Sequence, residues 1–267
     1  MQADIAHYGG SRPIHSIFIG GGTPSLFSPR GMIKLMEMVR RVVDLEPDAE
    51  VTLEANPGTV QDSAERFTAY RQAGINRLSL GAQSFDNQRL EDLGRIHRSE
   101  QIGEAFRAAR AAGIRRINID IMHGLPGQTA AAAIDDLAQA TRLGPEHISW
   151  YQLTIEPNTV FYRNPPVLPD EDVLAGIQDR GLSFLAERGF DRYEVSAFAT
   201  PGEQSRHNLN YWRFGDYLGI GAGAHGKITH PDRIERTRKT RSTPGLSDFP
   251  KSESSGDSSR MNYRSSS

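Results

Sequence analysis

The chain has 267 residues, of which 37% are hydrophobic and 24% charged, so it can form one large domain or two small ones. Its formal net charge of −2 gives no reason to expect a nucleic-acid partner, and it leaves at most a transient contact with a membrane. No apolar run approaches the roughly 18 residues of a membrane span, and no signal peptide opens the chain, so we expect a cytoplasmic protein.

Cysteine is absent from the sequence. Disulfide bonds and thiolate metal sites are therefore excluded within this chain. We predict no metal ligands among its own residues.

Apolar strands and amphipathic helices alternate along the chain. The first predicted strand is Ile17–Ile19, and Ser28 and Pro29 are typical of a helix start, as N-cap and first helical residue. Further strands are predicted at residues 51–54, 76–80, 115–122, 147–153 and 193–195. Further helices are predicted at residues 63–73, 86–93, 99–112, 129–143 and 170–188.

This alternation predicts an α/β protein with a parallel sheet and right-handed crossovers. The strand–helix units suit an open or partial (β/α)6 barrel. A Rossmann fold would require G-x-G-x-x-G after the first strand, and the sequence lacks it. Residues 1–230 are predicted to form the barrel core. Residues 231–267, which are basic and then rich in serine, are predicted to be a disordered tail.

Glycines and polar residues gather where the predicted strands end. The first strand runs into Gly20–Gly22, where glycine tolerates positive φ and lets a ligand approach the backbone. The other polar residues near strand ends are Glu54, Gln83, Asp120 and His123, with Arg95 on the helix after Gln83. Parallel strands end on one face of a barrel, so these side chains could share a pocket. Taken singly, each residue is better explained by a helix cap, a loop contact or a surface ion pair, and their recurrence at successive strands favours a ligand.

A second group of candidate residues lies in the segment Arg206-His-Asn-Leu-Asn-Tyr-Trp212. Its histidine, asparagine, tyrosine and tryptophan could hold a flat aromatic ligand by stacking or by axial ligation. The alternative is a structural histidine that only forms hydrogen bonds. The glycine-rich turn at residues 219–226 could approach a ligand with its backbone or could only form a tight corner.

Several motifs in order resemble one known family. They are Ile17-Phe-Ile-Gly-Gly-Gly-Thr-Pro-Ser25, Leu53-Glu-Ala-Asn-Pro-Gly58, Ser79-Leu-Gly-Ala-Gln-Ser-Phe85, Leu93-Gly-Arg-Ile-His97 and the segment 118–129, Asn-Ile-Asp-Ile-Met-His-Gly-Leu-Pro-Gly-Gln-Thr. Over about residues 1–241 the chain resembles the radical S-adenosylmethionine proteins of the oxygen-independent coproporphyrinogen III oxidase type. The motif His207-Asn-x-x-Tyr-Trp212 resembles the haem-chaperone branch of that family, the HemW type.

The resemblance implies a fold and a set of ligands. It implies a partial (β/α)6 barrel that is incomplete at its N-terminus, lacks the first family strand and binds S-adenosyl-L-methionine. The implied cofactor-binding residues are Gly21, Gly22, Thr23, Glu54, Gln83, Arg95 and Asp120. The implied haem-binding residues are His207, Asn208, Tyr211 and Trp212. A [4Fe–4S] cluster and haem are implied only for an intact parent, because the family's cluster-binding cysteines are absent from this chain.

The resemblance also implies a function in porphyrin and haem metabolism. It implies a haem chaperone that delivers haem to acceptor proteins, here as a fragment truncated at both ends. One alternative is an oxygen-independent coproporphyrinogen III oxidase, which decarboxylates its substrate to protoporphyrinogen IX. Another is a fragment that binds nothing. No catalytic residue is assigned, and we expect this chain alone to be inactive as an enzyme, because radical cleavage requires the cluster.

Overall fold

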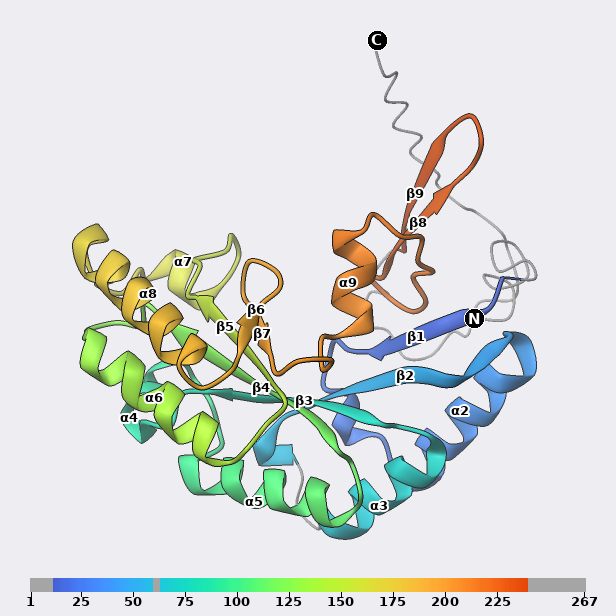
Figure 1. Cartoon of the computed structure of the whole chain (residues 1–267), viewed down its shortest axis with the longest axis horizontal. Coiled ribbons are helices and arrows are strands. Elements are labelled where there is room, and N and C mark those ends of the chain that lie inside the picture. The colour runs from blue at the N-terminus through green and yellow to red at the C-terminus, as the bar shows by residue number, and fades with distance from the viewer. Residues whose placement is uncertain (1–11, 60–62, 240–267) are drawn as a thin grey trace.

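A curled, mainly parallel sheet organises the computed structural model, which describes residues 12–59 and 63–239. Within these residues the main sheet has seven strands in the order β1-β2-β3-β4-β5-β7-β6. The five parallel strands are β1 (Ile14–Ile19), β2 (Leu45–Ala55), β3 (Arg77–Gln83), β4 (Arg116–His123) and β5 (His147–Gln152). The predicted α/β class with a partial, open barrel is confirmed (Figure 1).

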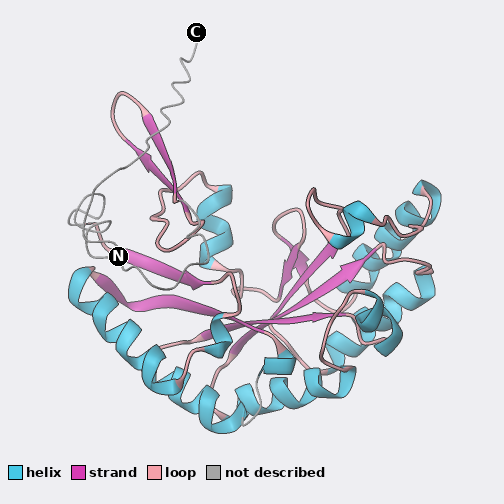
Figure 2. Cartoon of the chain, turned by 180° about the vertical axis from the view of Figure 1, so that it is seen from behind, coloured by secondary structure: helices cyan, strands magenta, loops and turns pink. Residues whose placement is uncertain are grey.

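Helices connect these strands and cover the convex side of the sheet, as both views of the chain show (Figures 1 and 2). The start of the first one is set by Ser28, whose side chain accepts a hydrogen bond from the Gly31 backbone at 3.1 Å. The covering helices are α2 (Pro29–Val42), α3 (Ser63–Ala73), α4 (Asn87–Asp92), α5 (Ser99–Ala111), α6 (Ala130–Arg142) and α8 (Glu171–Ala186). All lie where the sequence predicted a helix.

The predicted sixth parallel strand at residues 193–195 is wrong. Two short strands flank it instead, β6 (Asp191–Arg192) and β7 (Ala197–Ala199). Between them the Ser196 backbone donates to the Glu194 carboxylate at 3.1 Å, and the chain reverses direction. The strand that reaches β5 therefore runs antiparallel to it.

The two faces of the sheet differ in polarity because side chains alternate along a strand. Leu53, Leu80 and Ile119 point to the convex face, where they are buried against the helices in one hydrophobic core. Ser79 and Asn118 are one residue out of phase with them and form hydrogen bonds with each other. The concave face of the barrel is therefore lined with polar side chains.

The last described segment returns over the concave side, beside β1 (Figure 1). It holds α9 (Arg206–Trp212) and a hairpin of β8 (His225–Thr229) and β9 (Ile234–Arg238). The sequence did not predict these elements, nor the short helices α7 (Val160–Arg163), η1 (Pro24–Leu26) and η2 (Pro57–Thr59). Residues 234–238 were placed in the tail that was predicted to begin at residue 231, but they form a strand. Residues 240–267 of that predicted tail lie outside the described residues.

Candidate functional site

A cavity of about 230 Å³, here called the small cavity, opens at the carboxyl ends of the parallel strands. It is lined by all the strand-end residues predicted to bind a cofactor except Gly22, namely Gly21, Thr23, Glu54, Gln83, Arg95 and Asp120. It is also lined by Asn56, Ser79 and Gly81, which the sequence analysis did not include. A signal for two of them existed, because Ser79 and Gly81 precede Gln83 by steps of two along one strand and so share its face.

The glycine-rich turn brings backbone amides to the carboxylate of Glu54. The Gly21 N–H donates to Glu54 Oε2 at 3.0 Å, and Gly21 has φ of 90°. A Cβ at position 20 would lie 2.9 Å from the Glu54 carboxyl group and 2.6 Å from the Phe18 ring, so only glycine fits there. Thr23 also has positive φ, 75°, in spite of its branched side chain. The turn is thus shaped around the acid.

The two carboxyl groups of the small cavity hold protons more tightly than free acids do. Burial raises the pKa of Glu54, and the hydrogen bond from Gly21 opposes the shift. Burial raises the pKa of Asp120 to about 6, against hydrogen bonds from Asn118 and Ser79. With a pKa of about 6, Asp120 is mostly ionised at pH 7 and can accept hydrogen bonds from a ligand.

Gln83 enters the small cavity from an unusual backbone conformation, with φ of 66°. Its side chain is buried, and its Oε1 atom has no hydrogen-bond partner among residues 12–59 and 63–239. The loop after it is held by Asp136, whose carboxylate accepts from the Phe85 backbone at 2.7 Å and from Ser84 Oγ at 2.9 Å. Gln83 thus lines the small cavity and carries a buried acceptor atom without a partner in the described part of the chain.

His97 supports the segment that carries Arg95. It is buried, and its Nε2 lies 3.2 Å from the carbonyl oxygen of Ala82, which can only accept, so Nε2 is the protonated nitrogen. Burial lowers the pKa of His97, so the ring is neutral. From the motif Leu93-Gly-Arg-Ile-His97 no role was predicted for this histidine.

His123, which was expected to share the pocket with the other strand-end residues, does not line the small cavity. It points to the opposite face of β4, where its ring lies 4.2 Å from the Trp150 ring, centroid to centroid. Strand alternation explains this, because His123 is an odd number of residues from Asp120. Burial lowers its pKa to about 4.

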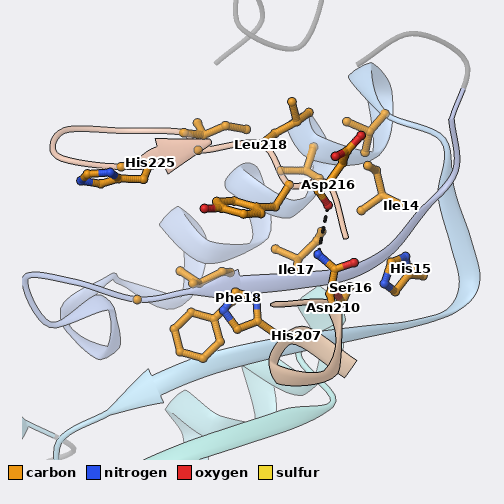
Figure 3. Close-up of a pocket in the computed structure, with 18 of the residues that line it drawn as sticks. Ile14, His15, Ser16, Ile17, Phe18, His207, Asn210, Asp216, Leu218 and His225 are labelled. Carbon is orange, nitrogen blue, oxygen red and sulfur yellow. Dashed lines mark hydrogen bonds between the residues drawn. The ribbon is translucent and has the colours of Figure 1, made fainter. Parts of the chain in front are cut away.

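A larger cavity, of about 790 Å³, lies between β1 and residues 216–228 (Figure 3). Its walls combine apolar strand residues with His207 and Tyr211 of α9. The His207 ring stacks on Phe18 with 4.4 Å between centroids, and Tyr211 lies 4.5 Å from Tyr217. Burial lowers the pKa of His207 to about 4, so its imidazole is neutral at pH 7. This space is called the large cavity below.

The other two residues of the predicted haem-binding group do not line the large cavity. Asn208 Nδ2 donates to the Tyr193 hydroxyl at 3.1 Å, and Trp212 Nε1 donates to Glu194 Oε2 at 3.0 Å. Helical geometry separates the pairs, because residues four apart share a face and adjacent residues do not. Two residues of the motif, His207 and Tyr211, thus line the large cavity, and the other two contact the loop before β7.

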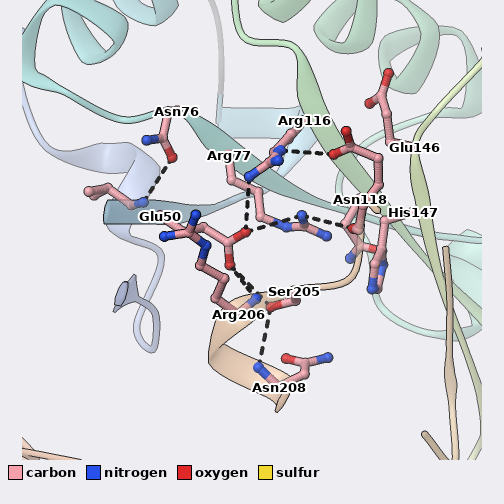
Figure 4. A network of polar contacts seen from close by, with 12 residues as sticks. Glu50, Asn76, Arg77, Arg116, Asn118, Glu146, His147, Ser205, Arg206 and Asn208 are labelled. Carbon is pink, nitrogen blue, oxygen red and sulfur yellow. Dashed lines mark hydrogen bonds and ion pairs between the residues drawn. The ribbon is translucent and has the colours of Figure 1, made fainter. Parts of the chain in front are cut away.

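A buried polar network joins the sheet to α9 (Figure 4). Glu50 Oε2 lies 3.4 Å from Arg77 Nη1 and 3.8 Å from Arg116 Nη1, and the side chains of Glu50 and Arg77 are almost fully buried. Glu50 Oε1 accepts from the Arg206 backbone N–H at 2.8 Å, at the start of α9. Ser205 caps that helix by accepting from the Asn208 backbone at 3.3 Å. One glutamate therefore holds two strands and the helix beside the large cavity.

Two further properties concern metals and membranes. Among residues 12–59 and 63–239, no three histidine, aspartate or glutamate side chains come together as a possible metal site. In the same part of the chain, no helix combines the length and the apolar character needed to cross a bilayer.

Comparisons with known proteins relate the chain to one superfamily. The model of the radical SAM superfamily matches residues 3–140. The chain is 53% identical over 247 residues to "Heme chaperone HemW" of Escherichia coli (strain K12), which covers 92% of this chain and 65% of that protein. It is 41% identical to the protein of the same name in Bacillus subtilis (strain 168), covering 82% of this chain and 59% of that protein.

One solved structure has a similar fold. Coproporphyrinogen III oxidase (HemN) of Escherichia coli, described as a radical SAM enzyme, matches with a TM-score of 0.74 over 89% of this chain and 58% of that chain. At 23% sequence identity this likeness shows the fold alone. The chain spans about 65% of the length of the Escherichia coli HemW that it resembles in sequence.

Proposed function

This chain belongs to the radical SAM superfamily, and from that premise we propose that it binds S-adenosylmethionine in the small cavity and haem in the large one. The function is that of a haem-chaperone relative, which holds haem as cargo for an acceptor protein. The observation that carries the proposal is the pairing of two spaces on one sheet. A polar cavity lies at the strand ends, and a larger cavity of apolar, aromatic and some polar residues, which includes the neutral His207, lies beside α9.

The residues around the small cavity fit S-adenosylmethionine. Its ribose hydroxyls and methionyl ammonium group donate hydrogen bonds, and Glu54 and Asp120 offer carboxylates to accept them. Among the described residues the Oε1 atom of Gln83 has no partner, and burying an acceptor in this way lowers the stability of the fold. A ligand that donates a hydrogen bond to this atom would offset that loss. Arg95 can hold the methionyl carboxylate bidentately. The backbone around Gly21 and Thr23 completes the wall next to the methionyl end.

The residues present do not fit an iron–sulfur cluster. When bound beside a cluster, S-adenosylmethionine supplies radical chemistry by cleavage at its sulfonium, and thiolates hold that cluster. This chain has no cysteine. We therefore assign this chain a binding role for S-adenosylmethionine and no cleavage step.

The large cavity suits a flat, hydrophobic cargo. Its volume of about 790 Å³ lies within the roughly 300–1,000 Å³ of sites for small molecules and cofactors. Neutral imidazole is an iron ligand in haem proteins, and His207 is neutral at pH 7 because burial lowers its pKa to about 4. Phe18, Tyr211 and Tyr217 add aromatic surface against which a macrocycle can pack.

The haem assignment predicts a specific loss on substitution. His207→Ala should raise the Kd for haem at least about tenfold, since it removes a ligand worth more than 1.4 kcal/mol. The measurement is a haem titration followed by Soret absorbance. His230→Ala is the matched control, because His230 does not line the large cavity and should leave the Kd unchanged. Anaerobic consumption of coproporphyrinogen III without haem binding would contradict the chaperone proposal and favour the oxidase.

The assignment of S-adenosylmethionine predicts a dependence on Asp120. Asp120→Asn should weaken binding by about 1–3 kcal/mol, or roughly 5- to 150-fold in Kd, because the ligand loses a charged acceptor in a partly buried site. Calorimetry of the whole chain with S-adenosylmethionine measures this. Asp135→Asn, on the exposed side of α6, is the control and should bind like the original chain. Equal affinities for the two variants would remove Asp120 from the site.

A further inference from the structure

A continuous series of hydrogen bonds connects α9 to the small cavity. Asn208 Nδ2 lies 3.1 Å from the Tyr193 hydroxyl, which lies 2.6 Å from His147 Nε2. His147 Nδ1 lies 2.6 Å from Asn118 Oδ1, and Asn118 Nδ2 lies 2.7 Å from Asp120 Oδ1. We call these five residues the relay. Asn208, Tyr193 and His147 come from other parts of the chain, Asn118 lies on the same strand as Asp120, and no step exceeds hydrogen-bond distance.

The chemistry of the groups gives the relay one direction. The Asp120 carboxylate only accepts, so the Asn118 amide nitrogen faces it and the amide oxygen faces His147. That oxygen also only accepts, so His147 carries its proton on Nδ1 and its Nε2 is an acceptor. The Tyr193 hydroxyl must therefore donate to Nε2, and its oxygen accepts from Asn208. Every donor in the relay thus points toward Asp120.

The surroundings of the relay support this neutral, ordered arrangement. His147 and Asn118 are buried, and burial with the nearby Arg77 guanidinium lowers the pKa of His147 well below its usual value. Ser149 Oγ donates to Asn118 Oδ1 at 3.1 Å, and the Ser205 backbone donates to the Tyr193 hydroxyl at 3.3 Å. These contacts agree with the direction that the five side chains require.

We propose that Asn118, His147 and Tyr193 are positioning residues that orient the Asp120 carboxylate for its ligand and connect it to α9, the helix beside the large cavity. This inference rests on the proposed function, since it names residues that act on the same binding site. None of the three lines the small cavity, so they act through Asp120. Through these hydrogen bonds, the orientation of the Asp120 carboxylate depends on the Tyr193 hydroxyl in the loop before β7.

Other charged or titratable groups face Asp120 and define the background for a test. Glu54 on β2 adds to the effect of burial by raising the pKa of Asp120 through charge repulsion. Burial and the charge of Asp120 raise the pKa of Tyr151 on β5. Arg95 lines the same cavity. Substitution of Tyr193 changes none of these groups. If that substitution changes the pKa of Asp120, the change is therefore transmitted by the relay.

Tyr193→Phe tests the proposal. Without the hydroxyl, nothing keeps His147 Nε2 an acceptor, so the imidazole proton can move to Nε2 and the Asn118 amide can turn its oxygen toward Asp120. We expect the pKa of Asp120, measured from its carboxyl ¹³C signal in the whole chain, to rise by about one unit or more. The Kd for S-adenosylmethionine at pH 7 should rise several-fold, and the midpoint of its pH dependence should move upward with the pKa.

The control and the outcomes separate this inference from the proposed function. Tyr162→Phe makes the same change at an exposed tyrosine of α7 and should alter neither the pKa of Asp120 nor the Kd. An Asp120 pKa that stays within about 0.3 units in Tyr193→Phe would overturn the relay, because the expected shift is about one unit or more. If S-adenosylmethionine fails to bind even the original chain, the proposed function fails, while the carboxyl signal still decides the relay.

Discussion

Replacing Glu50 by glutamine is expected to lower the free energy of unfolding by about 3–5 kcal/mol, the usual cost of breaking a buried ion pair from one side. Arg77 would keep its charge in a side chain that is almost fully buried, and its Nη2 atom already has no hydrogen-bond partner among the residues that the structure describes. The Arg206 backbone N–H at the start of α9 would also exchange a charged carboxylate acceptor for a neutral amide oxygen, which is a weaker acceptor. The variant should therefore be less stable and hold α9 less firmly.

Urea unfolding followed by circular dichroism measures this loss. Glu37→Gln is the matched control, because Glu37 lies on the exposed side of α2 and its substitution should change stability by less than about 0.5 kcal/mol. The double variant of Glu50→Gln with Arg77→Met should recover part of the loss, since it removes the uncompensated charge. A Glu50→Gln chain as stable as the original would show that the pair contributes nothing.

Asp136→Asn is expected to make the chain more stable, relative to the original chain, as the pH rises. Burial raises the pKa of Asp136 from 3.8 to about 6, against hydrogen bonds from Phe85 and Ser84. Between those two values the folded chain binds more protons than the unfolded chain, so this group lowers the free energy of unfolding as the pH rises. Because asparagine does not titrate, the free energy of unfolding of the variant does not fall with pH for this reason. Relative to the original chain, its stability should increase by up to about 3 kcal/mol from pH 4 to pH 7.

The comparison of two chains at each pH isolates this group. Histidines whose pKa is lowered by burial, such as His123 and His207, titrate in the same range but are present in both chains and cancel. The variant also loses one carboxylate acceptor near Phe85, which shifts its stability by an amount that does not depend on pH. A stability difference that is constant from pH 4 to pH 7 would mean that Asp136 titrates alike in the folded and unfolded chains.

The small cavity could be predicted from the sequence for a general reason. Parallel strands all end at one edge of their sheet, so polar residues placed at successive strand ends come together whatever the details of packing. Glu54 and Asp120 were found in this way, without knowledge of any contact between them. The hydrogen bond of Glu54 to Gly21 and the positive φ of Gln83 could not be predicted, because loop geometry depends on contacts such as those of Asp136.

For the helix α9, the sequence indicated a ligand but not which face of the helix would meet it. Its motif indicated a ligand, and a period of 3.6 residues separates His207 and Tyr211 from Asn208 and Trp212. Which pair faces a cavity depends on how the helix is docked. That docking is set by Glu50, whose partner Arg206 lies 156 residues further along the chain. No local pattern carries information across such a distance.

The sequence by itself determined the order of the five parallel strands and of the helices that cover them, the absence of thiolate ligands and most of the wall of the small cavity. These follow from local periodicity, from composition and from the common edge of parallel strands. Only the tertiary structure decided the antiparallel pairing of β7, the outward position of His123, the division of the α9 motif and the relay to Asp120. Each of these depends on side chains that meet from distant parts of the chain, where burial and hydrogen bonding select one arrangement among several that the local sequence allows.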